Sequence, residues 1–183
     1  MESLIDLISW GLAGLTVVGG VWLILMIIFS SLKQGGLVVD WFKKRALKGA
    51  FGVSLLATLG SLFYSEIAHL TPCRLCWFQR IFMYPLPIIL GIGLLKKEKG
   101  VFKYGLALSL IGVVIALYHY WLQVGGVESV TCGVVGYSPS CSNYFFLRFG
   151  YITIAMMSLT AFSIVSLLLG WTGEILDQEE TDL

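Results

Sequence analysis

Long apolar stretches and short polar gaps alternate along the chain. A helix needs roughly 20 mostly apolar residues to cross a bilayer. Five stretches meet this length: Leu4–Ser31, Ala50–Leu70, Cys76–Leu95, Tyr104–Leu122 and Phe149–Trp171. They take up most of the chain and leave no room for a soluble domain. The pattern predicts an all-α integral membrane protein with five transmembrane helices.

The composition excludes a water-soluble globular protein. Hydrophobic residues make up 57% of the chain and charged residues 13%, with a mean hydropathy of +0.87. A single soluble core cannot accommodate so many apolar side chains, so membrane lipid is the expected surrounding. The formal net charge of +1 argues against a nucleic-acid partner.

The basic residues are grouped, and the grouping predicts the orientation in the membrane. By the positive-inside rule, gaps rich in lysine and arginine face the cytoplasm. The N-terminus and both cysteine-containing gaps then face the periplasm or the extracellular space, where disulfides persist, and the C-terminus is cytoplasmic. Nine of the twelve basic residues follow the first or third stretch: Lys33, Lys43, Lys44, Arg45, Lys48, Lys96, Lys97, Lys99 and Lys103.

The first stretch is predicted to be a retained helix instead of a cleaved signal peptide. Its flank carries Glu2 and Asp6 in place of lysines. Its apolar run also exceeds the roughly 7–15 residues of a signal-peptide core, and no clear small-residue cleavage site follows it.

Two patterns concern helix packing. Pro85 and Pro87 remove two backbone donors from the third stretch and predict a bend there. In the fourth stretch, small residues recur at steps of four, three and four, along one side of a helix. They either form a tight seam with another helix or reflect the ordinary composition of membrane helices. These residues are Gly105, Ser109, Gly112 and Ala116.

Four cysteines occur as two pairs in polar gaps. Cys73 and Cys76 precede the third stretch, and Cys132 and Cys141 follow the fourth. The CxxC motif of the first pair is compatible with a zinc site or a structural disulfide. A second outward pair and the membrane context favour a redox role.

The start of the third helix predicts a thiolate at Cys76. Thr71 can cap this helix and Pro72 suits its first turn. The partial positive charge of a helix N-terminus lowers the pKa of a thiol, and Arg80 lies four residues beyond Cys76 on the same face. Arg80 also has a structural explanation, because long basic side chains snorkel to the membrane interface.

The residues around the first pair resemble a known family. The segment Pro72-Cys-Arg-Leu-Cys-Trp-Phe-Gln-Arg-Ile-Phe-Met-Tyr-Pro85 is similar to the signature of the DsbB-type disulfide bond formation proteins. The resemblance covers about residues 50–171. It implies a quinone-dependent protein thiol:disulfide oxidoreductase of the bacterial cytoplasmic (inner) membrane, built as a four-helix transmembrane bundle.

Three parts of the chain are expected from this resemblance. Residues 1–49 would hold an additional N-terminal transmembrane helix and a basic cytoplasmic loop. Residues 50–172 would form the four-helix bundle, and residues 173–183 an acidic cytoplasmic tail.

The resemblance also implies roles for the cysteines. Cys73 and Cys76 would be the quinone-coupled pair, with Cys76 contacting ubiquinone or menaquinone beside Arg80. Cys132 and Cys141 would exchange disulfides with a soluble thioredoxin-fold partner of the DsbA type. The partner would attack Cys132, and Cys141 would resolve the mixed disulfide. A monomer without a bound metal is expected.

Three polar residues near the outer helix ends are further candidates. His119 would hydrogen-bond a quinone oxygen or move protons, and the family has a histidine near its quinone. The alternative is an interfacial histidine within the aromatic belt. Glu66 and His69 are candidates for proton transfer, although an interfacial pair is the preferred interpretation.

The chain departs from the best-known members of the family in its additional helix and in loop cysteines only nine positions apart. Short-loop relatives exist, so the activity is still expected, but the short tether requires Cys132 to lie almost above Cys73. Two other interpretations remain. One is a quinone reductase of the vitamin K epoxide reductase type, in which the quinone-proximal CxxC follows the loop pair. The other is a non-catalytic membrane protein whose cysteines form structural disulfides or bind zinc.

Overall fold

A computed structural model describes residues 2–31, 41–98, 100–126 and 140–181. Five segments within these residues are long and apolar enough to cross a membrane, so the predicted all-α membrane fold is confirmed. No β-strand occurs in this part of the chain. The helical elements are α1 (Glu2–Ser31), α3 (Ala46–Leu62), the π-helical turn η1 (Phe63–Ile67), α4 (Arg74–Met83), α5 (Pro85–Lys96), α6 (Val101–Gly125) and α7 (Ile154–Thr181).

The third span is interrupted at Tyr84, where the two prolines predict a bend. α4 ends at Met83, and α5 begins at Pro85. Because proline has no N–H group, it suits the first turn of a helix, where that group has no intrahelical partner. The interruption separates α4, which carries the cysteine motif, from α5, which buries Leu86 and Leu90 in the core.

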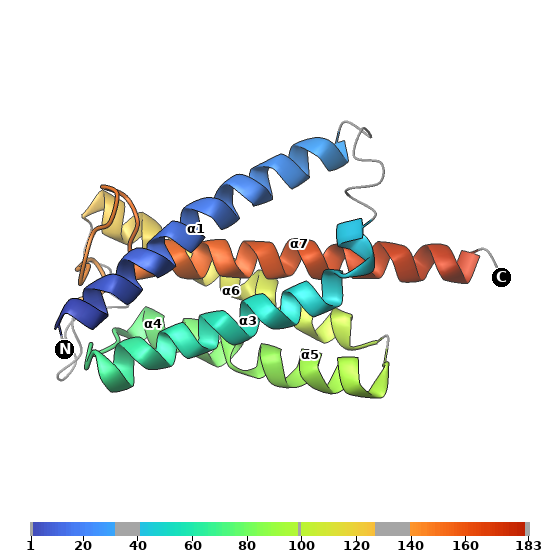
Figure 1. The fold of residues 1–183 in the computed structure, drawn as a ribbon, viewed down its shortest axis with the longest axis horizontal. Helices are drawn as coiled ribbons and strands as arrows, with labels where there is room; N and C mark the ends of the chain where they lie inside the picture. Colours follow the sequence, from blue (N-terminus) through green and yellow to red (C-terminus); the bar gives the residue numbers. More distant parts are fainter. Residues whose placement is uncertain (1, 32–40, 99, 127–139, 182–183) are drawn as a thin grey trace.

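α7 is the central helix of the bundle. It packs against α6, α3 and α1, and Figure 1 shows α1 crossing it at an angle. Phe162, Val165 and Leu169 of α7 are fully buried. Large apolar side chains elsewhere point outward, such as Leu95 and Val114, as a lipid-facing surface requires.

α6 meets α7 along its small residues, and the seam interpretation is therefore confirmed. A Cβ atom added at Gly112 would overlap the ring of Phe162. Ser166 Oγ of α7 donates to Ser109 Oγ of α6 at 2.9 Å. Small side chains permit this close approach of the two backbones. The buried residues of the seam on α6 are Gly105, Ser109, Gly112 and Ala116.

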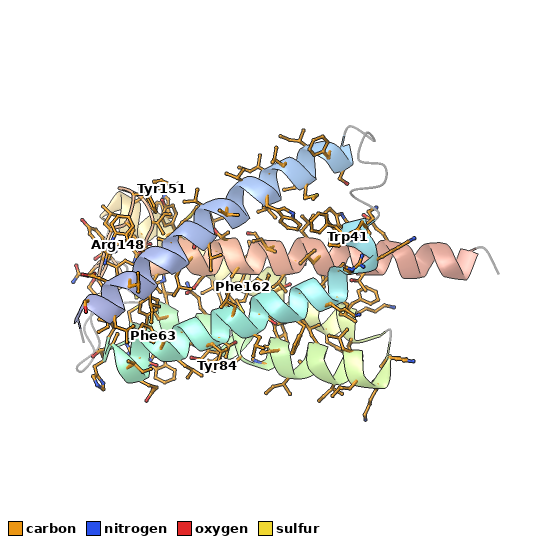
Figure 2. The ribbon with its side chains drawn as sticks, in the orientation of Figure 1. Trp41, Phe63, Tyr84, Arg148, Tyr151 and Phe162 are labelled. Carbon is orange, nitrogen blue, oxygen red and sulfur yellow. The ribbon has the colours of Figure 1, made fainter. Side chains whose placement is uncertain are left out.

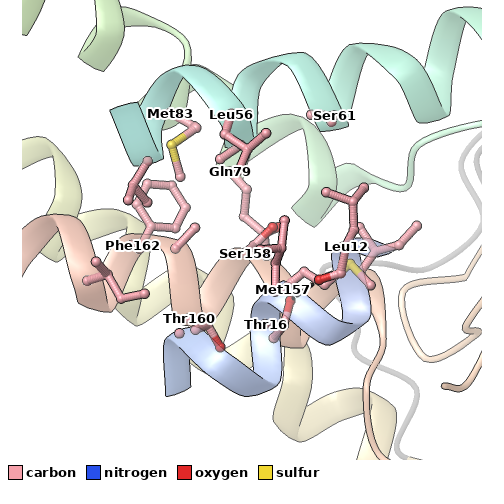
Figure 3. Close-up of a pocket in the computed structure, with 18 of the residues that line it drawn as sticks. Leu12, Thr16, Leu56, Ser61, Gln79, Met83, Met157, Ser158, Thr160 and Phe162 are labelled. Carbon is pink, nitrogen blue, oxygen red and sulfur yellow. Dashed lines mark hydrogen bonds between the residues drawn. The ribbon is translucent and has the colours of Figure 1, made fainter. Parts of the chain in front are cut away.

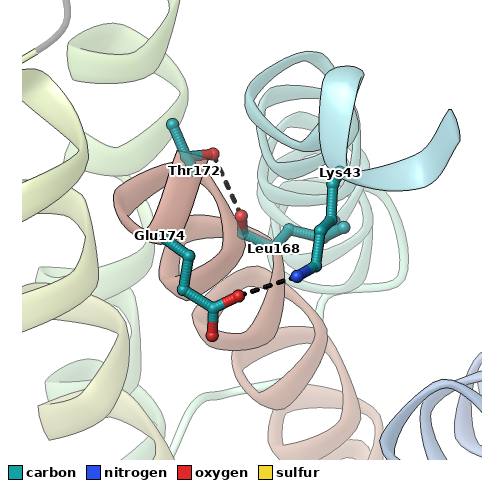
Figure 4. Close-up of polar contacts among 4 residues, drawn as sticks. All are labelled: Lys43, Leu168, Thr172 and Glu174. Atoms are coloured by element: carbon teal, nitrogen blue, oxygen red, sulfur yellow. Dashed lines mark hydrogen bonds and ion pairs between the residues drawn. The ribbon is translucent and has the colours of Figure 1, made fainter. Parts of the chain in front are cut away.

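The two ends of the bundle differ in chemistry. The turns rich in lysine lie at the end where α3 and α6 begin, and the CxxC motif lies at the opposite end (Figure 1). At the lysine end, Lys43 Nζ pairs with Glu174 Oε2 at 2.9 Å (Figure 4). The predicted acidic tail starts as a continuation of α7, which runs to Thr181. Lysines and cysteines are separated along the bundle, as the predicted orientation requires.

The segment between Cys141 and α7 attaches α1 to the bundle at the cysteine end. Arg148 forms an ion pair with Asp6, and its guanidinium lies 4.9 Å from the ring of Trp10. The rings of Trp10 and Phe149 meet edge to face at 5.1 Å. Figure 2 shows Arg148 and Tyr151 beside the N-terminal half of α1.

The fifth span starts later than its apolar pattern predicts. Phe149 and Gly150 adopt left-handed φ values of 53° and 80°, and a backbone bridge joins Arg148 to Ile152. These conformations are incompatible with a right-handed helix. α7 consequently begins at Ile154 instead of Phe149.

Candidate functional site

The side chain of Cys73 caps α4. Its backbone is extended, and its Sγ accepts a hydrogen bond from the backbone N–H of Cys76 at 3.4 Å. An N-cap of this kind satisfies a donor that has no partner within the first turn. The predicted cap at Thr71 is wrong because the sulfur takes this role two residues later. Pro72 precedes the cap and lies outside the first turn.

The two sulfur atoms of the CxxC motif are close but not bonded covalently. Cys73 Sγ and Cys76 Sγ lie 3.0 Å apart in hydrogen-bond contact, and both cysteines are free. A disulfide bond is about 2.05 Å long. The structure therefore shows the reduced pair, with Cys73 buried and Cys76 half-buried.

Three hydrogen-bonding groups surround the sulfur of Cys73. They are the Cys76 thiol, the Cys76 backbone N–H and His119 Nε2, which lies 3.6 Å away. The hydrogen bond with the Cys76 thiol lowers the pKa of Cys73 to about 4; burial opposes this shift, and His119 adds to it. The sequence predicted the thiolate at Cys76, whereas these contacts favour it at Cys73, and the alkylation experiment of the Discussion tests between the two positions.

His119 is held by side chains of α4 and α6, with support from Thr153 just before α7. It is 1% exposed on α6. Gln79 Nε2 of α4 donates to His119 Nδ1 at 3.0 Å, which leaves Nε2 to carry the hydrogen atom toward Cys73. Gln123 Nε2 lies 3.5 Å from His119 Nε2 and is itself held by Thr153, whose Oγ1 donates to Gln123 Oε1 at 2.7 Å. This network orients the imidazole toward the sulfur.

A cavity of about 490 Å³ joins the CxxC pair to the segment that carries Cys141. Its lining includes Cys73, Cys76 and His119 on one side and Ser140 and Asn143 on the other. We call it the sulfur cavity. His119 faces this cavity and does not line the larger one described below, so its predicted contact with a quinone stays a prediction.

Cys141 lies next to the CxxC pair. It is 1% exposed and packs in one cluster with Cys73, Leu75 and Leu122. Cys141 is disulfide-bonded. Cys132, predicted to lie above Cys73, is outside the described residues. The structure thus brings one member of the second pair to the first, although 65 positions separate Cys76 from Cys141.

A second, larger cavity of about 700 Å³ also reaches the CxxC motif and shares Cys76, Phe145 and Ile154 with the sulfur cavity. Cys76, Gln79 and Arg80 line it at the cysteine end. It continues between α1, α3 and α7, with mostly apolar walls, to Arg45 and Lys48 near the lysine end. We call it the apolar cavity. Figure 3 shows Gln79 and Met83 projecting into it.

Arg80 is held in place at the mouth of the apolar cavity. Its Nη2 donates to the backbone oxygen of Ser61 at 3.2 Å, and the guanidinium lies 5.3 Å from the ring of Trp77. The side chain is half-buried. A snorkelling arginine directs its charge into water, whereas Arg80 is bound to the backbone of α3 beside the cavity that Cys76 lines. The geometry favours the functional interpretation.

Sequence reasoning missed Gln79. It is 5% exposed, orients His119 and lines the apolar cavity. The sequence did offer a reason to consider Gln79: it is a polar amide within an apolar stretch. Polar groups buried in membrane helices need partners and are often functional. Glu66 and His69 are exposed and line neither cavity, which agrees with the interfacial interpretation.

The site also has the ligands for a soft metal ion. The ligand atoms of Cys73, Cys76 and His119 all lie within 4.8 Å of one another. Thiolate and imidazole suit zinc or copper(I). The geometry by itself is therefore compatible with thiol redox chemistry and with metal binding.

Comparison with known proteins separates these interpretations. A sequence model of the family "Disulfide bond formation protein DsbB" matches residues 43–172. The SPbeta prophage-derived disulfide bond formation protein B of Bacillus subtilis is 47% identical over 115 residues, covering 63% of this chain and 76% of the relative. Disulfide bond formation protein C of the same organism is 41% identical over 123 residues, covering 65% and 86%. A probable disulfide formation protein of Coxiella burnetii is 36% identical over 146 residues, covering 79% and 91%. No solved structure matches the chain.

Proposed function

The chain belongs to the DsbB family of disulfide bond formation proteins, and from this premise we propose that it passes electrons from a DsbA-like thioredoxin-fold protein to a membrane quinone. It is a multi-pass membrane protein of disulfide bond formation, and the names of its relatives indicate a thiol oxidoreductase. The partner, the quinone and the residue roles are the proposed part.

The position of Cys76 carries the proposal. Among the described cysteines, Cys76 alone lines both cavities. The sulfur cavity connects it to the Cys141 segment. The apolar cavity extends from it between the membrane-spanning helices α1, α3 and α7. A sulfur atom at this junction is suited to take electrons from a protein thiol and deliver them to a lipid-soluble acceptor.

The apolar cavity fits a quinone. Cavities of about 300–1,000 Å³ bind small molecules when apolar walls are combined with a few polar groups. Here the guanidinium of Arg80 and the amide of Gln79 offer hydrogen-bond donors beside Cys76. Cys76, Gln79 and Arg80 would hold a quinone ring there, and the quinone would supply an acceptor for two electrons and two protons.

The arrangement of the reduced pair suits disulfide formation. The Cys73 thiolate would attack the sulfur of Cys76, 3.0 Å away, as two electrons leave from the Cys76 side toward the acceptor. One S–S bond would form. The proton of the Cys76 thiol and one proton from solvent would accompany the two electrons to the acceptor. His119 would stabilise the Cys73 thiolate until this step.

The second pair would restore the dithiol. A reduced partner would transfer its two electrons to a Cys132–Cys141 disulfide and leave as a disulfide itself. The resulting loop dithiol would then reduce Cys73–Cys76 across the sulfur cavity. The burial of Cys141 against Cys73 supports this transfer, because little movement is needed between the pairs.

The test combines purified full-length protein, a reduced DsbA-type protein and either ubiquinone-1 or a menaquinone analogue. Partner thiols should disappear, and quinol should appear in equal amount. Cys76→Ser should abolish quinol formation, while a mixed disulfide between Cys132 and the partner is still trapped. Partner oxidation that proceeds equally without quinone would contradict the proposal.

The same preparation tests the two rival interpretations. A zinc protein would contain one metal ion per chain, would lose it in His119→Ala, and would have thiols that do not respond to quinone. An enzyme of the vitamin K epoxide reductase type would reduce quinone with a small dithiol but would form no mixed disulfide with a DsbA-type protein. Either result would replace the proposed function.

We propose that the protein lies in the bacterial cytoplasmic membrane with its cysteine end outside. Quinone reduction and partner binding would both take place at that end. A membrane-impermeant maleimide should label a single cysteine introduced at Ser142 in intact cells, but not one introduced at Lys96. The reverse pattern would invert the orientation. The lysine-rich ends of α3 and α6 support the proposed direction.

A further inference from the structure

α1 lies outside the part of the chain that the family shares, yet it forms a wall of the apolar cavity. The family match begins at residue 43, after α1 has ended. Six residues of α1 nevertheless line the cavity: Leu12, Leu15, Thr16, Val18, Gly19 and Trp22. Figure 3 shows Leu12 and Thr16 across the cavity from Leu56 and Gln79.

The cavity is long and changes character along its length. Cys76, Gln79 and Arg80 line it at the cysteine end, and Arg45 and Lys48 line it near the lysine end. On α3 the lining extends from Ser61 back to Lys48, which corresponds to roughly 20 Å at 1.5 Å per residue. Between these ends the walls are mostly apolar. The cysteine end and the apolar middle together match a polar ring joined to an extended hydrocarbon.

α1 is fastened over this cavity at several points. The ion pair of Asp6 with Arg148 and the edge-to-face rings of Trp10 and Phe149 hold its first turns. Further along, a Cβ atom added at Gly19 would lie 3.0 Å from Ile164 of α7, so the two helices are in close contact. The ring of Trp22 lies 6.4 Å from that of Trp171. These contacts make α1 a fixed wall.

We propose that α1 encloses the hydrocarbon tail of the quinone between itself, α3 and α7, so that this chain selects for long-tailed quinones. The inference rests on the proposed function and assigns a role to the helix that the family match omits. The continuity of the cavity with Cys76 and Arg80 favours a quinone tail over the acyl chain of a phospholipid as the occupant.

The test compares two quinones that share one ring and differ in the tail: ubiquinone-1, with one isoprene unit, and ubiquinone-8, with eight. Dissociation constants are measured on the full-length protein from quenching of tryptophan fluorescence, since Trp22 and Trp41 line the cavity. Thr16→Phe on α1 and Ala57→Phe on α3 add a ring to opposite walls. Val21→Phe is the matched control, because Val21 is 53% exposed on α1 and does not line the cavity.

Each filling variant should raise the dissociation constant of ubiquinone-8 at least tenfold and that of ubiquinone-1 less than twofold, while Val21→Phe changes neither. Equal binding of ubiquinone-8 by all variants would overturn the inference. If the filling variants weaken the binding of ubiquinone-1 and ubiquinone-8 equally, the filled region holds the ring and not the tail, and the inference is also overturned. A phospholipid that co-purifies with the wild type and is lost from Thr16→Phe, without a change in quinone affinity, would assign the cavity to an acyl chain. If the wild type binds neither quinone, the proposed function itself fails.

Discussion

Replacing His119 by alanine tests whether the anion of the reduced pair resides on Cys73. His119 Nε2 is one of three groups that contact the Cys73 sulfur, at 3.6 Å, and Gln79 holds the ring in that orientation. Removing the imidazole removes a donor to the thiolate but leaves the two contacts from Cys76. The pKa of Cys73 should therefore rise while remaining below the ordinary value for cysteine.

The size of the rise follows from the geometry. A hydrogen bond to a charged group contributes about 1.5–3 kcal/mol, and the 3.6 Å contact with His119 is the longest of the three. The lower end of that range is therefore appropriate. Since 1.36 kcal/mol corresponds to one pKa unit, His119→Ala should raise the pKa of Cys73 from about 4 by about one unit.

The assay is the rate of alkylation by iodoacetamide between pH 3.5 and pH 8. Only the thiolate reacts, so the rate at Cys73 should stay constant as the pH falls from 8 to 6 and decline only near its pKa. Arg74 separates the two cysteines, so trypsin releases them on different peptides and mass spectrometry follows each one alone. His69→Ala, which changes the only other histidine of the chain, is the matched control.

Two results would refute the reasoning. In the first, Cys76 is alkylated faster than Cys73 at pH 6. The thiolate would then lie on Cys76, as the sequence predicted from the helix N-terminus and Arg80, and not on the capping residue Cys73. If His119→Ala and His69→Ala have the same profile as the wild type, the imidazole makes no contribution to the acidity of Cys73.

Further predictions concern the acceptor site and the packing of the bundle. Arg80→His should raise the KM for quinone about tenfold without preventing the mixed disulfide with the partner; an unchanged KM would restore the snorkelling explanation. Gly112→Leu should cost roughly 1–3 kcal/mol through overpacking against α7 and lower the thermal midpoint, whereas Gly170→Leu, where an added Cβ meets no atom within 4 Å, should not. Arg148→Gln should accelerate hydrogen exchange in the first turns of α1, and unchanged exchange would show that the ring contact suffices. Lys43→Gln should change stability by less than about 1 kcal/mol, because its ion pair is exposed.

The spans could be read from the sequence because lipid imposes a simple length and composition on a helix. The start of the fifth span was predicted incorrectly. Phe149 continues the apolar pattern of the fifth span, yet its positive φ and the backbone bridge between Arg148 and Ile152 keep it outside α7. An apolar side chain is equally suited to lipid and to packing against Trp10, so hydropathy could not locate this helix start.

The sequence identified most residues of the candidate site but not what each of them does. The CxxC spacing identified Cys73 and Cys76, but the sequence did not show that Cys73 would cap the helix and accept the hydrogen bond of the Cys76 backbone N–H. Gln79 was missed because its role depends on His119, which is 40 positions away. A pattern of neighbouring residues cannot show that two side chains this far apart in the sequence are in contact.

By itself, the sequence determined that this protein is a bundle of membrane helices with cysteines at one end and lysines at the other, because hydrophobic length and charge grouping are local properties of a chain in a bilayer. Tertiary structure alone decided that Cys141 lies against Cys73, that His119 turns toward sulfur, and that α1 completes the wall of the apolar cavity. These facts depend on which helices become neighbours. That choice arises from side-chain packing between segments far apart in the chain, such as Gly112 against Phe162 and Gly19 against Ile164.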